Sequence, residues 1–118
     1  MNTPIRVAIY GSSLFLTAVI AVLRHHAAIT LIQFNTETTT EDVMKYNPAI
    51  MVYQDCAAPR NPNRLLEADV KLLKIDSQQS VITIYQHNRM KQEYPICRSI
   101  DLISVITQEK PKGVVAYV

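Results

Sequence analysis

Residues 5–26 read IRVAIYGSSLFLTAVIAVLRHH, and this stretch decides the fold. Its first six residues carry a single charge, Arg6, among apolar and aromatic side chains, which is typical of a strand covered on both faces. Gly11 then allows a tight turn, and the two serines that follow it are good helix caps. Because nine of the ten residues from Leu14 to Leu23 are apolar, the helix has almost no polar face. A strand, a glycine turn and an apolar helix are typical of the opening unit of a parallel α/β sheet.

The length and composition indicate one globular domain. With 118 residues, of which 48% are hydrophobic and 19% charged, the chain can bury a single core and does not have the composition of a disordered or fibrous protein. We expect the domain to span residues 1–110, with an apolar tail over 111–118 as an added or exchanged strand. The net charge of +2 comes from basic residues scattered along the chain, which disfavours nucleic acid as a partner.

Two features of the sequence favour a cytoplasmic location. Cys56 and Cys97 are far apart, which indicates neither a disulfide framework nor a zinc site and favours a reducing compartment. The apolar run after Arg6 is similar in composition to a signal peptide, but residues 11–13 interrupt it and basic residues 24–26 stand where a cleavage region is small and neutral. The run is also too short to cross a bilayer, so we expect no membrane partner.

Hydrophobic periodicity predicts alternating strands and helices after residue 26. The predicted strands are 29–34, 49–54 and 81–86, and the predicted helices are 41–46, 63–75 and 100–108. A further strand over 91–97 follows residue 86 too closely for a crossover connection, so we expect it to be antiparallel, after a turn at Asn88 and Arg89. The apolar residues 114–118 are expected to add to a sheet edge or to pair with another chain.

The stretches IRVAIYGSSLFL, residues 5–16, and NPAIMVYQD, residues 47–55, give the chain a resemblance to the receiver domains of bacterial response regulators. The pattern covers roughly residues 5–87. The resemblance implies a flavodoxin-like α/β fold, a three-layer sandwich with a mainly parallel sheet in strand order 2-1-3-4-5. The short link after residue 86 makes strand 5 antiparallel in this expectation. The resemblance also implies a signalling role with a protein partner.

The phosphorylation chemistry of receivers is missing from the sequence. Receivers hold magnesium with an acidic pair after the first strand, where this chain has Gly11 and Ser12. The position of the phosphorylated aspartate falls on Gln54, with Asp55 one residue later, and Gln86 stands where the family has Ser or Thr. These departures predict a non-enzymatic pseudo-receiver that works by protein contact. A receiver phosphorylated on Asp55 is the least favoured hypothesis.

The carboxyl ends of the strands are where an open α/β sheet binds ligands, which gives an alternative function as a small-molecule or anion-binding domain. The competing interpretation is that the serines only cap the helix and that the acidic residue only opens a turn. No motif indicates a metal site or a cofactor. The residues expected at this edge are Gly11, Ser12, Ser13, Gln54, Asp55 and Gln86, with His87 beside them.

The apolar surface of the first helix favours a homodimer. One side of this helix must cover the sheet, and a second apolar side indicates burial under another subunit. The alternative is that the tail or the last predicted helix covers that second side. The residues expected at the interface are Leu14, Phe15, Ala18, Val22, Val114 and Val115.

Overall fold

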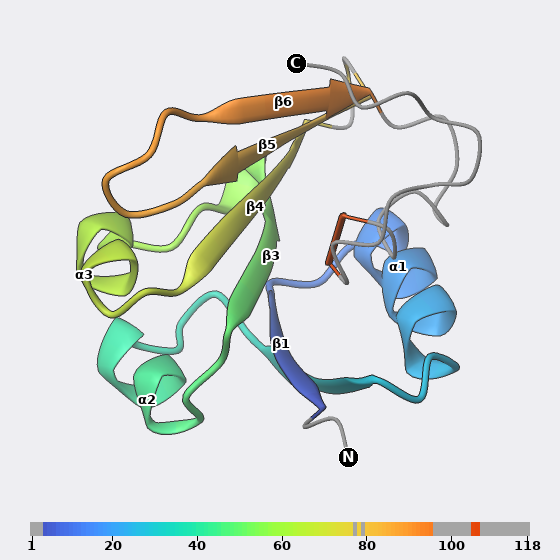
Figure 1. The fold of residues 1–118 in the computed structure, drawn as a ribbon. Helices are drawn as coiled ribbons and strands as arrows, with labels where there is room; N and C mark the ends of the chain where they lie inside the picture. The colour runs from blue at the N-terminus through green and yellow to red at the C-terminus, as the bar shows by residue number, and fades with distance from the viewer. Residues whose placement is uncertain (1–3, 77, 79, 96–104, 107–118) are drawn as a thin grey trace.

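A computed structural model of the chain describes residues 4–76, 78, 80–95 and 105–106. Within these residues it forms a mixed α/β structure with a six-stranded sheet (Figure 1). The elements are β1 (Ile5–Tyr10), α1 (Leu14–Arg24), β2 (Ile29–Phe34), α2 (Thr40–Lys45), β3 (Ile50–Gln54), the 3-10 turn η1 (Asp55–Ala57), α3 (Pro62–Glu67), β4 (Lys71–Asp76), β5 (Val81–Tyr85) and β6 (Gln92–Pro95).

The sheet combines a parallel half with an antiparallel half. Its strand order is β2-β1-β3-β4-β5-β6. The pairs β1–β2, β1–β3 and β3–β4 are parallel, whereas β4–β5 and β5–β6 are antiparallel. The parallel pairs are joined by helical crossovers and the antiparallel pairs by short turns, as their geometries require. The order is compatible with a flavodoxin-like fold up to β4, and β5 and β6 extend the sheet beyond it.

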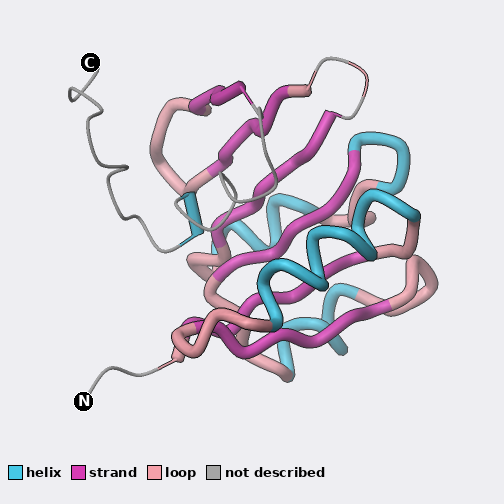
Figure 2. The backbone as a smooth tube through the Cα atoms, turned by 90° about the vertical axis from the view of Figure 1, so that its right-hand side faces the viewer, coloured by secondary structure: helices cyan, strands magenta, loops and turns pink. Residues whose placement is uncertain are grey.

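Two apolar clusters, one on each face of the sheet, make three layers. The first gathers α1 residues such as Leu16 and Leu23 with sheet residues such as Val7, Val52 and Ile82. The second packs α2 and α3 against the opposite face. In Figure 2, α1 lies in front of the strands, and α2 and α3 lie behind them. Because both faces are covered, the central strands read as continuous apolar runs, and every residue of β3 is buried.

Local capping sets the starts of the first two helices. The Ser13 hydroxyl accepts a hydrogen bond from the Leu16 amide at 3.0 Å, and Thr39 caps α2 in the same way through the Asp42 amide at 3.2 Å. The acidic residues of the first turn of α2 also suit the positive end of its dipole. The helices predicted over 41–46 and from Leu14 are therefore confirmed, with bounds shifted by one or two residues.

The helix predicted over 63–75 is wrong. The α3 helix ends at Glu67, and Asp69 adopts a positive φ of 62° that reverses the chain direction. The Val70 amide then closes the helix end by donating to the Leu65 carbonyl at 3.0 Å. Residues 71–76 form β4, whose alternate side chains enter opposite clusters, with Leu72 in one and Leu73 in the other. A strand buried on both faces has consecutive apolar residues, and this pattern also fits a helical stripe.

The topology after β3 therefore differs from the prediction. The strand predicted over 81–86 is present as β5, but it is antiparallel to its neighbour β4, and the sheet has six strands instead of five. The antiparallel strand predicted over 91–97 is confirmed as β6 over Gln92–Pro95. Asn88 in the turn between them has a φ of 59°, a conformation that asparagine tolerates well.

Most of the predicted C-terminal elements lie outside the described residues. Of the helix expected over 100–108, residues 105–106 are described and helical. Ile106 is buried in the cluster under α1, and Val105 packs against the same cluster. The tail over 111–118 is not among the described residues, and the domain bounds stay a prediction. Within the described part of the chain, none of the helices is long and apolar enough to span a membrane.

Candidate functional site

The carboxyl edge of the parallel strands brings the ends of β1 and β3 together. Tyr10 pairs with Tyr53, so Gly11 and Gln54 follow on neighbouring strands. Gly11 has a φ of 100°, which favours glycine, and its backbone is fully engaged. Its amide donates to the Phe34 carbonyl at 2.8 Å, and its carbonyl accepts from the Gln33 side-chain amide at 3.0 Å.

The position above Gly11 is bordered by side chains of its own chain. A side-chain carbon placed on this glycine would lie 3.5 Å from a Thr36 methyl group and 3.9 Å from the Ala57 methyl group. The Tyr10 hydroxyl also donates to the Thr36 carbonyl at 2.8 Å, which holds the loop after β2 over this edge. The distances from the added carbon are ordinary van der Waals contacts, so these neighbours closely surround the place where a ligand bound to the β1 turn would lie.

The two serines of the β1 turn differ in their surroundings. Ser13 is the cap of α1, as its hydroxyl accepts from Leu16, and its carbonyl accepts from both the amide and the hydroxyl of Thr17 at 2.9 Å. Ser12 is exposed. The capping interpretation therefore holds for Ser13, and Ser12 is the hydroxyl that faces solvent.

The end of β3 offers one buried amide and one exposed carboxylate. Gln54 is 7% exposed and is one of two polar residues in the core of the described structure. Asp55 is exposed and opens η1, the turn that carries Ala57 over Gly11. Asp55 therefore lies beside the candidate edge and not within the sheet. In the described residues, no group of three or more His, Cys, Asp or Glu side chains is placed to hold a metal ion.

Gln86 does not join the other predicted site residues. It follows β5, and β5 is antiparallel to β4 with Tyr85 opposite Leu72. The end of β5 therefore lies at the amino edge of the parallel strands, at the opposite side of the sheet from Gln54. The prediction for Gln86 and its neighbour His87 fails because it assumed that 81–86 runs parallel to β3.

The residue that the sequence reasoning missed at the carboxyl edge is Asp76. Gln54 pairs with Ile75, and Asp76 is the next residue of β4. Its carboxylate accepts from the Gln78 amide at 3.0 Å and so shapes the turn into β5. If residues 71–76 are recognised as a parallel strand, the acidic residue at its end is predicted to lie at this edge.

Two side chains of the neighbouring strands β3 and β4 have perturbed pKa values. Burial raises the pKa of Tyr53 to about 12, with a smaller contribution from Tyr85. The Lys74 ammonium lies 5.6 Å from the centre of the Tyr85 ring. Burial, and to a lesser extent Arg89, lowers the pKa of Lys71 at the start of β4. Both shifts follow first from burial of the side chain against the sheet.

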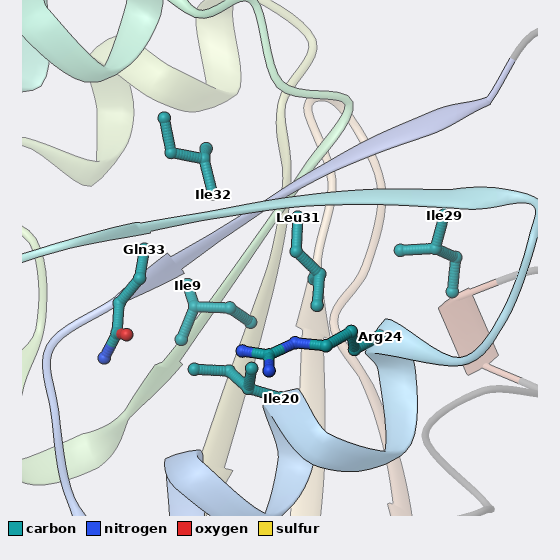
Figure 3. Close-up of a pocket in the computed structure, with 7 residues that line it drawn as sticks. All are labelled: Ile9, Ile20, Arg24, Ile29, Leu31, Ile32 and Gln33. Atoms are coloured by element: carbon teal, nitrogen blue, oxygen red, sulfur yellow. The ribbon is translucent and has the colours of Figure 1, made fainter.

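A cavity of about 240 Å³ lies between α1 and the edge strand β2 (Figure 3). Its apolar lining comes mainly from Ile20 on α1 and from Ile29 and Leu31 on β2. The Arg24 side chain extends across it from the end of α1, and Gln33 lies at its other end. Arg24 supplies the single charge of this lining, and nothing in the sequence analysis identified the cavity.

The outward side of α1 carries the residues expected at an interface. Leu14 is 90% exposed and Ala18 is exposed, whereas Phe15 and Val22 are half-buried. Phe15 packs on the cluster that contains Ile106, so one side of α1 near Phe15 is covered by the protein's own chain. The remaining two predicted interface residues, at positions 114 and 115, lie outside the described residues.

Comparisons with protein families, with curated proteins and with solved structures give no match to this chain. The receiver resemblance therefore stays a prediction that depends on the stretches 5–16 and 47–55 and on the strand order.

Proposed function

We propose that this chain is a non-enzymatic domain of the pseudo-receiver type that works by protein contact and associates as a homodimer. The observation that carries the proposal is the outward surface of α1. From Leu14 to Leu23 it has no charge, and Leu14 is 90% exposed. The other exposed residues of this stretch are Thr17, Ala18 and Ala21, and an uncharged, mostly apolar helix face is typical of a protein interface.

The residues at the carboxyl edge support contact over phosphotransfer. Magnesium prefers carboxylate oxygens, and the turn after β1 offers Gly11, Ser12 and Ser13 in their place. Ser13 already serves as the helix cap, and Gln54 is an amide that cannot accept a phosphoryl group as an aspartate does. Asp55 lies in η1, one residue past the strand end. A strand order that is compatible with a receiver up to β4, without an acidic pair after β1, supports this proposal.

Sedimentation velocity of the intact chain at micromolar concentration tests the proposal. We expect a dimer. A monomer up to roughly 100 μM, the weak end of specific protein association, would contradict the homodimer. Incubation with acetyl phosphate and magnesium separates contact from phosphotransfer, because a pseudo-receiver leaves Asp55 unlabelled in mass spectrometry. A labelled Asp55 would favour an active receiver.

The second candidate is binding of an anion or small molecule at the carboxyl edge. It is favoured by the gathering of Gly11, Ser12 and Gln54 at the ends of adjacent strands. The side chains that border Gly11 within 4 Å and the engaged hydroxyl of Ser13 count against it. Thermal shift measurements against nucleotides and inorganic phosphate distinguish the two candidates. A saturable stabilisation that Ser12→Ala removes would favour binding, and a flat response across the panel would discard it.

A further inference from the structure

The outer edge of β2 is an unguarded sheet edge in the described structure. Among the described residues, β2 is paired only with β1. Its sequence, ITLIQF, has six residues without a charge or a proline. Natural proteins protect exposed edges with charges, prolines, bulges or short strands, because the free backbone groups otherwise pair with another strand. None of these devices is present in the sequence of β2.

The hydrogen-bond pattern identifies the backbone groups that face outward. The Ile5 amide donates to the Ala28 carbonyl, and the Gly11 amide donates to the Phe34 carbonyl. In a parallel pair, alternate residues direct both backbone groups to the same neighbour, so even-numbered residues of β2 face β1. Leu31 and Gln33 therefore direct their amide and carbonyl groups away from the sheet. The Ile29 amide is used in the preceding turn, where it donates to the His26 carbonyl at 3.1 Å.

We propose that β2 pairs antiparallel with β2 of a second copy of this chain, so that the two sheets become continuous across the dimer. The inference rests on the homodimeric state in the proposed function. It places the contact between the two copies at β2 and leaves the outward side of α1, with Ala18, for contact with a protein partner. A two-fold axis perpendicular to the sheet pairs a strand with its own copy antiparallel, and it keeps both α1 helices on the same side. The outward groups of Leu31 and Gln33 supply the hydrogen bonds between the copies.

A second copy fits this edge better than a charged peptide does. The strand is neutral, so it neither repels its own copy nor attracts a partner by charge. Two strands alone cover less than the roughly 800 Å² per partner of a stable interface. The cavity and the flank of α1 that borders it add apolar surface, from Ile20, Leu31 and the exposed Ala21. Arg24, the charged residue at this cavity, has a long stem that lets its guanidinium turn to solvent.

Sedimentation equilibrium of the intact chain and its variants tests the pairing. Leu31→Lys adds a charge to the edge. Gln33→Pro removes an outward amide and also the side-chain hydrogen bond to the Gly11 carbonyl, which Gln33→Ala removes alone as a matched control. Leu31→Lys and Gln33→Pro should each raise the dimer dissociation constant at least about tenfold, with a native circular dichroism spectrum, and Gln33→Ala should not. Ala18→Lys adds the same charge to the outward side of α1 and should leave the dissociation constant within about threefold of the original.

The outcomes distinguish this inference from the proposed function. A monomeric original chain contradicts both. A dimer that Leu31→Lys and Gln33→Pro leave intact contradicts the strand pairing alone, and dissociation by Ala18→Lys then assigns the interface to the outward side of α1. Dissociation by Leu31→Lys and Gln33→Pro only supports the pairing.

Hydrogen exchange gives a readout that needs no variant. In the dimer, the amides of Leu31 and Gln33 are bonded, so their exchange should slow by at least about tenfold when the protein concentration passes from monomer to dimer. The amides of Thr30 and Ile32 face β1 at every concentration and serve as the internal control. Fast exchange of Leu31 and Gln33 in a solution that sedimentation shows to be dimeric overturns the strand pairing.

Discussion

The two outer strands of the sheet differ in almost every property that controls strand pairing. β2 is six residues long, uncharged, and joined to the sheet by parallel pairing beside α1. β6 has four residues, all of them exposed, and includes Glu93 and Pro95. Edge charges and prolines discourage further pairing. By these criteria, β6 is protected against further strand pairing and β2 is not.

The packing behind the two strands differs as well. Ile29 of β2 is buried in the cluster that contains Leu23 of α1. Tyr94 of β6 is 41% exposed, and its hydroxyl lies 3.4 Å from the Gln92 side chain of the same strand. We therefore expect packing on the parallel half of the sheet to contribute most of the unfolding free energy, and β6 to contribute little.

The largest expected effect is at the α1 side of this comparison. Leu23→Ala leaves a cavity beneath α1 and should cost about 4 kcal/mol of unfolding free energy, because Leu23 is fully buried. Tyr94→Ala on β6 should cost less than about 1 kcal/mol, since nearly half of that side chain already meets water. Urea denaturation of both variants measures the difference. Equal losses would show that β6 is as integral to the core as α1.

Much of this asymmetry was accessible from the sequence, because the strands at residues 5–10, 29–34 and 50–54 have strong β composition and clear turn signals. The failure over 63–75 has a physical cause. Leu65, Leu66, Leu72 and Leu73 fit one helical stripe, but Leu72 and Leu73 pack on opposite faces of the sheet. The sequence contains no glycine or proline between residues 63 and 76 to separate the two elements. The chain turns at Asp69, which has a positive φ, and an aspartate in the sequence is only a weak indication of such a turn.

The candidate site was predictable only where the parallel strands were. Gly11, Ser12, Ser13 and Gln54 fall at the expected edge because β1 and β3 were identified correctly. Gln86 was misplaced and Asp76 was missed for one shared reason. The prediction had a helix over 71–75 where the chain forms β4, so it gave the next strand the wrong direction and overlooked the acidic residue at the end of β4. The Arg24 cavity could not be inferred, because it depends on how α1 sits over β2 and not on any local pattern.

A smaller effect is expected in the middle of the sheet, between the two edges. Tyr53 on β3 has a pKa raised to about 12 by burial, against about 10 in the unfolded chain. Its contribution to stability is therefore complete below pH 10 and is lost as the pH rises from 10 to 12. At about pH 11 the loss should be roughly 1.4 kcal/mol, and Tyr53→Phe should lack it. Denaturation of both proteins across this range measures the difference, and parallel pH profiles would contradict the assignment to Tyr53.

The smallest effect on stability is expected at β6, where the comparison of edges can be reversed. Glu93→Thr removes the charge from this strand and should change the unfolding free energy by less than about 0.5 kcal/mol, because the side chain is exposed. It should nevertheless increase association in light scattering, as the residues from Gln92 to Tyr94 then form a neutral edge. Glu67→Thr on the exposed end of α3 changes the net charge equally without touching an edge. If both variants associate to the same degree, the net charge of the protein, and not the Glu93 charge on the edge strand β6, controls association.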